Sequence, residues 1–264
     1  MKSIELLLMA DLLRHLNDLP NSFFYRGQAD ASWSLQSSLE RIIGASWSIE
    51  KAQKFEDYSI NQFRSKFHLY DRENIQPESK LAWLSIMQHY GVPTRLIDFT
   101  ESPYVALYFA LEAHNLQSGK NIALYALNYS EIMDKSIEFI KCKDKDFKET
   151  RLTVFEQQDK IFEDVVDRFS YDIAWIAEPK QLNARLDRQA GSFLLSGNRG
   201  LKVENVLSSE LYARTQCIKY VISPELFSGI FTLLRKMNIT SKSLYGNLDG
   251  LARSIKMQLQ IYSI

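Results

Sequence analysis

The segment from Ser102 to His114 constrains the fold more than any other part of the sequence. Ser102 offers a hydroxyl N-cap and Pro103 suits the first helical position, so a helix begins there. Tyr104 to His114 is apolar on nearly every side, which is typical of a helix buried on all faces. The longest apolar run, Tyr104 to Leu111, is far shorter than the roughly 20 residues that span a bilayer. We therefore expect a central helix in a globular protein, with no transmembrane segment.

The rest of the chain supplies layers to cover that helix. Short apolar or aromatic runs predict strands over 23–25, 95–99, 121–128, 171–176, 192–196 and 217–222. Helical spacing predicts helices over 3–16, 50–70, 81–90, 152–170 and 224–237. No repeat, low-complexity tract or linker divides the chain. We therefore predict a single α+β domain over 1–264, in which the helix over 3–16 is a packing or partner-binding extension.

Charge and cysteine content exclude several classes of protein. The chain has 32 Lys and Arg against 32 Asp and Glu, so its formal net charge is zero. Broad capture of duplex DNA needs an excess of positive charge, and we do not expect it here. Cys142 and Cys217 stand far apart with no CxxC pattern, which disfavours zinc ribbons and disulfide scaffolds. Residues 4–14 lack the pattern of a signal peptide. We expect a cytoplasmic protein without a bound metal.

The best-known catalytic motifs are missing from the sequence. It contains no GxSxG, GxxxxGK[ST], GxGxxG or HExxH, which removes the serine hydrolase, P-loop and zincin classes. Three polar clusters at the edges of apolar elements remain as candidates for a site. They cover residues 25–28, 89–102 and 183–193.

Arg26 and Gly27 are the candidate anion-binding residues of the first cluster. A guanidinium presents a planar fork of donors, and a glycine beside it lets a pyrophosphate approach the backbone closely. The alternative is an ordinary surface arginine at the end of a strand. Position alone does not decide between them.

The second and third clusters hold further polar candidates. Thr100 lies where a strand enters the helix and can bond a ribose hydroxyl, whereas helix capping explains Ser102 completely. His89 is either a general base or a histidine capping a helix end. Arg95 and Asp98 are either ligand contacts or a link between strand and loop. Gln189 can hydrogen-bond a ribose hydroxyl, or it is a plain polar residue of a loop.

Together the motifs resemble the FRG-domain family. The resemblance rests on Phe24-Tyr25-Arg26-Gly27-Gln28, on residues 88–103 and 106–110, on Arg185 with residues 189–193, and on residues 243–252. It extends from about Pro20 to Ile255. Phe99 stands where the family more often has Trp, and the aromatic ring is kept.

The same motifs are similar to those of ADP-ribosyltransferases of the Arg-Ser-Glu class. That resemblance implies a split, mostly antiparallel mixed sheet flanked by helices, with NAD as co-substrate. It gives Arg26 the place of the motif arginine, residues 100–102 that of the Ser-Thr-Ser motif, and Gln189 that of the catalytic Glu. It implies catalytic roles for Gln189, Thr100 and Glu101, and cofactor contacts from Tyr25, Arg26, Gly27, Gln28, His89, Arg95 and Ser102.

Gln189 departs from the transferase pattern, because it carries no charge. Cleavage of the nicotinamide–ribose bond develops positive charge on the ribose, which a carboxylate stabilises. Either Glu101, Asp98 or Asp187 supplies that carboxylate, or the chemistry is weak.

The resemblance implies a bacterial toxin-like or phage-defence effector that transfers ADP-ribose to a macromolecule and is silenced by an inhibitory, antitoxin-like protein. Single-stranded RNA is slightly preferred over protein as the acceptor, since aromatic side chains stack on bases. Two alternatives remain open. One is a non-catalytic sensor of NAD-derived or nucleotide ligands, and the other is a structural interaction domain.

Overall fold

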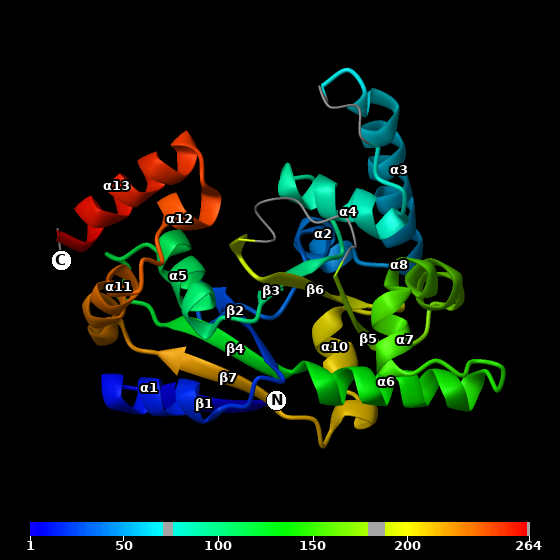
Figure 1. The fold of residues 1–264 in the computed structure, drawn as a ribbon, viewed down its shortest axis with the longest axis horizontal. Helices are drawn as coiled ribbons and strands as arrows, with labels where there is room; N and C mark the ends of the chain where they lie inside the picture. Colours follow the sequence, from blue (N-terminus) through cyan, green and yellow to red (C-terminus); the bar gives the residue numbers. More distant parts are fainter. Residues whose placement is uncertain (71–75, 179–187, 263–264) are drawn as a thin grey trace.

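The computed structural model describes residues 1–70, 76–178 and 188–262. This described part of the chain forms a seven-stranded sheet in the order β1-β7-β4-β2-β3-β6-β5 (Figure 1). β1 and β7 run parallel, and every other neighbouring pair is antiparallel. The strands are β1 (Lys2–Leu6), β2 (Phe23–Gln28), β3 (Ile97–Thr100), β4 (Ile122–Asn128), β5 (Ala174–Ala177), β6 (Gly191–Ser196) and β7 (Cys217–Ile222). The α+β class and the mixed, mostly antiparallel sheet are confirmed.

Helices flank the sheet along its whole length. They are α1 (Met9–Asp18), α2 (Ser38–Ile43), α3 (Ile49–Phe67), α4 (Lys80–His89), α5 (Pro103–Ala113), α6 (Tyr129–Lys143), α7 (Arg151–Glu156), α8 (Gln158–Ile161), α10 (Val203–Leu207), α11 (Phe227–Lys236), α12 (Ser241–Tyr245) and α13 (Leu248–Tyr262). Short 3-10 turns occupy Gly44–Ser46, Glu210–Tyr212 and Pro224–Leu226, and a π-helix covers Phe162–Asp167.

One face of the sheet carries two separate hydrophobic cores. In the first, α1, α5 and α11 pack on β1, β7, β4 and β2. In the second, α4, α6 and α8 pack on β5 and β6. The opposite face carries a third core that continues across both halves of the sheet, where Phe24 of β2 stacks on Phe99 of β3 with ring centroids 4.1 Å apart. The two halves are therefore joined on one face and separated on the other.

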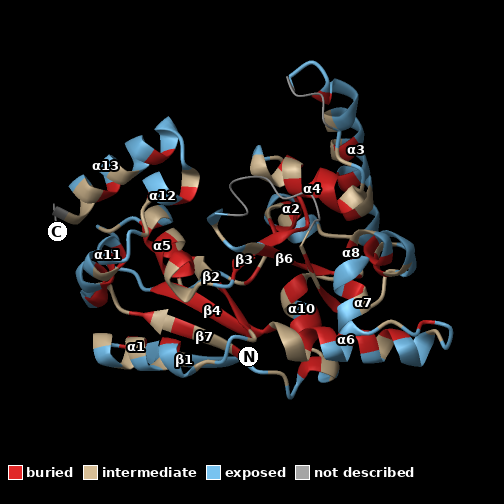
Figure 2. Ribbon diagram, viewed as in Figure 1, coloured by how far each residue is buried: buried red, intermediate tan, exposed pale blue. Residues whose placement is uncertain are grey.

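The helix predicted from Ser102 is central, as expected. The Ser102 hydroxyl accepts a hydrogen bond from the Val105 amide, which makes Ser102 the N-cap of α5. α5 packs against β2 and β4, and all seven residues of β4 beneath it are buried (Figure 2). α5 also packs against α11, and this coverage by both the sheet and a neighbouring helix explains why α5 lacks a polar face.

The predicted helix over 3–16 is wrong in its first part. Residues 2–6 form β1, which pairs in parallel with β7 from Lys2 to Leu6, and the helix begins only at Met9. Polar and apolar residues alternate over 3–6, with Ile4 and Leu6 turned toward the core. The strand gains a full ladder of backbone hydrogen bonds on β7, which an isolated turn of helix does not offer.

Three other segments differ in detail from the sequence prediction. β3 starts at Ile97, so Arg95 precedes the strand. α3 confirms the helix over 50–70. Its buried face differs from the expected one, since Glu56 is buried whereas Phe55 and Tyr58 are exposed. The helix expected over 152–170 is divided into α7, α8 and the π-helix. The strand over 217–222 agrees residue for residue.

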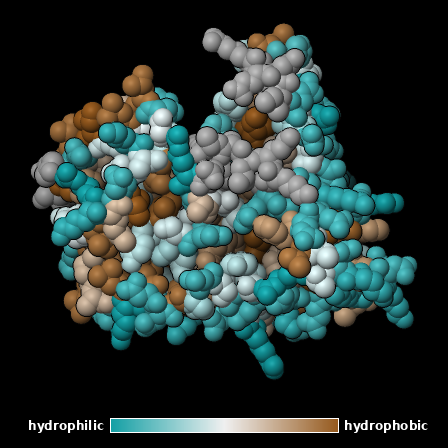
Figure 3. All heavy atoms as spheres, in the orientation of Figure 1, coloured by the Kyte–Doolittle hydropathy of each residue, from teal (hydrophilic) through white to brown (hydrophobic). Residues whose placement is uncertain are grey.

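The surface carries an apolar stripe on α13, formed by Leu248, Leu251, Ile255 and Leu259. Brown side chains mark the region of this helix in Figure 3, at the upper left of the view. Within the described ranges, no helix combines the length and apolar character needed to cross a membrane.

Candidate active site

The junction between β2 and β3 opens into a pocket of about 330 Å³. The two strands share one registered pair, Tyr25 with Thr100. Continuing that register would place Gly27 opposite Asp98, but the strands separate instead. Residues of β2, β3 and β6 line the pocket floor, while α4 forms one wall and α5 with α12 the other (Figure 1). The pocket thus lies between the two cores of this face.

Arg26 spans the gap between the separated strands. Its Nη1 donates a hydrogen bond to the Asp98 carbonyl oxygen at 2.8 Å and lies 3.9 Å from the Asp98 carboxylate. Its Nε is buried and has no hydrogen-bond partner among the described residues. Burial lowers the pKa of Arg26, and the nearby Asp98 charge opposes that effect. An arginine stays protonated under these conditions, so the guanidinium brings a cation with a spare donor to the pocket.

Gly27 lines the pocket, but the space that a Cβ would fill is taken by α5. A Cβ built there would lie 1.9 Å from the Ala106 carbonyl oxygen and 2.8 Å from the Ala110 nitrogen. The close approach that Gly27 permits is therefore that of a helix backbone. This corrects the expectation that its missing side chain admits a pyrophosphate.

A turn at Gln189 and Ala190 joins the second and third polar clusters. The Thr100 hydroxyl donates to the Gln189 carbonyl oxygen at 2.6 Å, and the Glu101 amide donates to the Ala190 carbonyl oxygen at 3.0 Å. Ala190 has a φ of 44°, a left-handed conformation that is strained for any residue but glycine. The turn carries the Gln189 side chain to the pocket, where its Nε2 is buried and has no hydrogen-bond partner within residues 1–70, 76–178 and 188–262.

Thr100 itself has little hydrogen-bonding capacity left for a ligand. Besides donating to Gln189, its hydroxyl accepts from the Ser102 amide at 3.1 Å. A hydroxyl has one donor and two acceptor positions, so a single acceptor position remains. The main effect of Thr100 is to position Gln189.

α4 brings three polar side chains to the opposite wall. Ser85, Gln88 and His89 all line the pocket from this helix. Ser85 is 3% exposed, and its buried hydroxyl has no hydrogen-bond partner in the described structure. The Gln88 amide donates to the Asp98 carboxylate at 2.9 Å. Ser85 therefore adds a third unused polar group, beside those of Arg26 and Gln189.

The wall formed by α5 and α12 combines aromatic rings with a carboxylate. Phe109 and Tyr245 meet edge to face with centroids 6.4 Å apart, and Glu112 lies beside them. Arg188 donates to the Tyr245 carbonyl oxygen at 3.0 Å and lies against Gly246, which has a φ of 67°. The residue next to Gln189 thus touches the α12 turn.

Of the proposed site residues, the structure brings Tyr25, Arg26, Gly27, His89, Thr100 and Gln189 to this pocket. Burial raises the pKa of Tyr25 to about 12, with smaller effects of Tyr220 and Tyr104, so its phenol stays neutral. The other four, Gln28, Glu101, Ser102 and Arg95, do not line it. Gln28 donates to the Ser34 carbonyl oxygen, Ser102 caps α5, and the Glu101 side chain is exposed. Arg185 and Asp187 lie outside the described residues.

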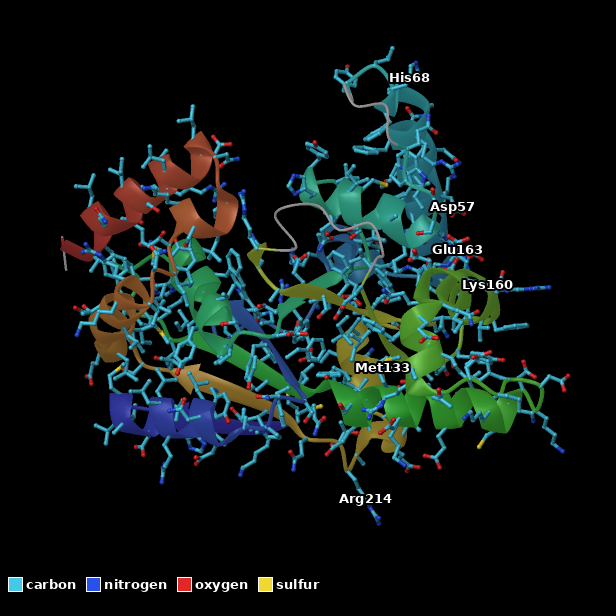
Figure 4. All side chains as sticks on the ribbon, viewed as in Figure 1. Asp57, His68, Met133, Lys160, Glu163 and Arg214 are labelled. Carbon is cyan, nitrogen blue, oxygen red and sulfur yellow. The ribbon has the colours of Figure 1, made fainter. Side chains whose placement is uncertain are left out.

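Arg95 belongs to a different cluster, which corrects its assignment as a cofactor contact. Its Nε lies 2.9 Å from a Glu56 carboxylate oxygen, and its Nη2 donates to Asp167. Lys80 and Arg199 complete this set, which we call the buried charge cluster. Asp57 pairs with Arg199 at its rim, and Figure 4 places Asp57 on the α3 side of the molecule. Charges on an isolated buried side chain are costly, and these groups neutralise one another.

Ser85, Glu112 and Tyr245 were not singled out from the sequence. Glu112 does have a recognisable signal, since it is the single charged residue of the otherwise apolar α5. Tyr245 lies in the C-terminal segment whose family resemblance was noted without a role. Ser85 resembles any small residue of a buried helix, and its sequence context gives no signal.

A known protein family matches the part of the chain that contains Arg26 and Thr100. Residues 21–119 match the FRG domain family. The chain carries an FRG domain. No curated protein and no solved structure matches the chain significantly.

The FRG domain spans β2, α4, β3 and α5, and so contributes most of the pocket. Gln189 and Tyr245 come from beyond the matched segment. The polar groups of the FRG domain meet those of the C-terminal half across the junction of β2 and β3.

Proposed function

We propose that the protein is an NAD-dependent ADP-ribosyltransferase. The observation that carries this proposal is the meeting of Arg26 and Gln189, from distant parts of the sequence, in one pocket where each has a buried donor left unpaired by the described part of the chain. Unpaired buried polar groups cost free energy unless a ligand satisfies them. Their placement therefore favours a ligand with both anionic and hydroxyl groups.

The residues present fit NAD in chemical character. The Arg26 guanidinium suits a pyrophosphate, because charge-assisted bonds from its fork are strong. The amide of Gln189 and the hydroxyl of Ser85 suit ribose hydroxyls or a carboxamide. Phe109 and Tyr245 offer aromatic faces and edges for a ring. The pocket volume lies within the range of roughly 300 to 1,000 Å³ found for small-molecule sites.

The chain's own part in the reaction is mainly positioning. Arg26 holds the anionic end, Gln189 holds the ribose next to the bond that breaks, and Thr100 with Glu101 fixes the turn that carries Gln189. Such orientation lowers the barrier before any charge is stabilised. His89 lies at the pocket as a candidate proton acceptor for the incoming nucleophile.

The acceptor in this proposal is a macromolecule, with single-stranded RNA preferred over protein. Zero net charge disfavours duplex DNA, while aromatic side chains at the pocket can stack on bases. The family resemblance supports a toxin-like or phage-defence effector, held silent in the cytoplasm by an inhibitory protein.

A second candidate function is a non-catalytic sensor of NAD-derived or nucleotide ligands. The neutral Gln189 favours it, because the motif position carries no acid. Binding of NAD without release of nicotinamide would distinguish the sensor from the transferase.

The experiment is incubation of the full chain with NAD labelled in the adenosine part and with cell lysate. Labelled product is then divided between nuclease and protease digestion, and nicotinamide release is measured in parallel. We expect label on nuclease-sensitive material. Nicotinamide release with protease-sensitive label would move the acceptor to protein, and no release in any fraction would contradict the transferase.

A further inference from the structure

We propose that Glu112 of α5 supplies the carboxylate that stabilises the ribose cation, in place of the acid missing at Gln189. This inference rests on the proposed transferase function. It replaces the three acids considered from the sequence. Glu101 does not line the pocket, Asp187 lies outside the described residues, and Asp98 does line the pocket but is engaged differently.

Glu112 is held in one orientation at the pocket wall. Ser241 donates to one carboxylate oxygen and the Tyr245 hydroxyl donates to the other, both at 2.7 Å. Its side chain is 12% exposed and lines the pocket. The two donors come from α12, so a helix far along the chain fixes the carboxylate without covering it.

The charge of Glu112 is not neutralised by a close cation among the described residues. The nearest paired nitrogen, Nη1 of Arg253, lies 3.9 Å away on a side chain that is 54% exposed. Water screens a pair of that kind, so its effect is small. Hydroxyl donors orient a carboxylate and leave its net charge in place. Glu112 therefore presents negative charge to the pocket.

Asp98 differs in both respects. Its carboxylate is 60% exposed, accepts from Gln88 and lies beside the Arg26 guanidinium. Its charge is thus offset by the cation that is proposed to bind phosphate, and a solvated carboxylate stabilises a transient cation weakly.

Contacts also place Glu112 on the same side of the pocket as Gln189. Arg188, the residue before Gln189, donates to the Tyr245 carbonyl oxygen, and the Tyr245 hydroxyl donates to Glu112. Arg188 and Tyr245 therefore connect the backbone next to Gln189 with the Glu112 carboxylate. Gln189 and Glu112 line the same pocket, so a ribose bound there by Gln189 is exposed to the negative charge of Glu112.

The proposed reaction breaks one bond at the ribose C1′ and forms another. The bond from the ribose C1′ to the nicotinamide nitrogen breaks, and its electron pair leaves with nicotinamide. Positive charge then spreads over C1′ and the ring oxygen, where the Glu112 carboxylate stabilises it without forming a bond. An oxygen or nitrogen of the acceptor attacks C1′, and its proton passes to His89 at the pocket.

The test compares Glu112→Gln with Ser241→Ala, using the full chain. Both changes disturb the contact between α5 and α12, but only the first removes the charge. We expect Glu112→Gln to lower kcat for nicotinamide release by about 100- to 1,000-fold, with the Kd for NAD within about threefold of wild type. Ser241→Ala removes one of the two donors that orient the carboxylate but keeps its charge, so we expect it to lower kcat by less than about tenfold. Glu112→Asp should recover part of the lost rate.

Two results would overturn this inference, in different ways. If Glu112→Gln and Ser241→Ala lose the same share of kcat, Glu112 acts only through packing. If wild-type protein binds NAD but releases no nicotinamide, the transferase function fails, and the catalytic role of Glu112 fails with it. Melting temperatures measured for each variant show that the proteins compared are folded.

Discussion

Arg26 shows how one side chain can serve the fold and the site together. Its Nη1 replaces a missing ladder contact by donating to the Asp98 carbonyl oxygen, while its Nε is buried and bonds to none of the residues that the structure describes. A lysine has a single nitrogen and cannot do both. Nη1 therefore makes the structural contact, and Nε makes the proposed ligand contact.

We expect Arg26→Lys to weaken NAD binding by about 30- to 1,000-fold, which corresponds to a loss of about 2 to 4 kcal/mol at a charge-assisted site. Isothermal titration calorimetry measures the change. Arg214→Lys is the matched control, because Arg214 is exposed and points away from the sheet at the lower edge of Figure 4. Full NAD affinity in Arg26→Lys would show that the guanidinium does not hold the phosphates.

Gly27 provides a prediction about packing. Because the Ala106 carbonyl oxygen would lie 1.9 Å from a new Cβ, Gly27→Ala must push β2 away from α5. We expect a loss of about 3 kcal/mol in the free energy of unfolding, measured by urea denaturation. In the control, Gly229→Ala, the Cβ meets the flexible Met9 side chain at 3.3 Å and should cost little. Equal stability of the two variants would refute the close packing of β2 on α5.

At the scale of elements, the start of α5 and the turn before β6 act as one unit. Thr100 and Glu101 bind the backbone of this turn, and Ser102 caps the helix that follows. The unit explains why three neighbouring polar residues have three different roles.

Substitution should separate those roles. Ser102→Ala removes a cap and should lower stability by about 1 kcal/mol without changing kcat. Thr100→Ala removes two buried hydrogen bonds, so we expect a loss of about 1 to 2 kcal/mol together with a fall in kcat of about 10- to 100-fold. Thr100→Ser keeps the hydroxyl and should retain most activity. Thermal melts and nicotinamide release measure both effects, and an unchanged kcat in Thr100→Ala would detach the turn from catalysis.

The accuracy of the sequence prediction varies with the range of the signal. Ser102 with Pro103, and Gly91 after α4, are local signals, and the helix boundaries that they predict are confirmed. β1 was mistaken for helix because its partner β7 lies more than 200 residues away in the sequence. A short segment that fits both the helical and the strand pattern becomes a strand when a sheet edge is available to pair with it.

The same difference between local and long-range signals applies to the site residues. Arg26 and Thr100 carry family motifs and were found, whereas the role of Glu112 depends on Ser241 and Tyr245. Arg95 lies within a motif, yet Glu56 and Asp167 bind it elsewhere. Contacts between residues this far apart in the sequence leave no pattern in the spacing of neighbouring residues.

At the scale of the whole molecule, the buried charge cluster ties α3, α4 and the π-helix together and makes stability depend on pH. Burial alone would raise the pKa of Asp167, but Arg95, Lys80 and Arg199 outweigh it and lower the pKa from 3.8 to about 2. Since the folded value lies below the unfolded one, Asp167 stabilises the protein above about pH 4. That contribution is lost as the pH falls from about 4 to about 2.

We expect this loss to amount to about 2 kcal/mol in the free energy of unfolding. Urea denaturation at pH 5 and pH 3 measures about half of this loss, roughly 1 kcal/mol, and Asp167→Asn should show a smaller difference between the two pH values than wild type. Asp134→Asn is the control, because the Asp134 carboxylate is 60% exposed and its ion pair at 3.2 Å is with the exposed Arg151. Equal differences for wild type and Asp167→Asn would contradict the shift.

The single registered pair between Tyr25 and Thr100 also determines how the native protein opens. Apart from this pair, the halves β1-β7-β4-β2 and β3-β6-β5 are held together mainly by the core on one face. Native-state hydrogen exchange should therefore resolve two cooperative units whose amides are protected to different degrees. Arg26 belongs to the first unit and Gln189 to the second, so a ligand bound to both would couple their opening and make the exchange of the two units concerted.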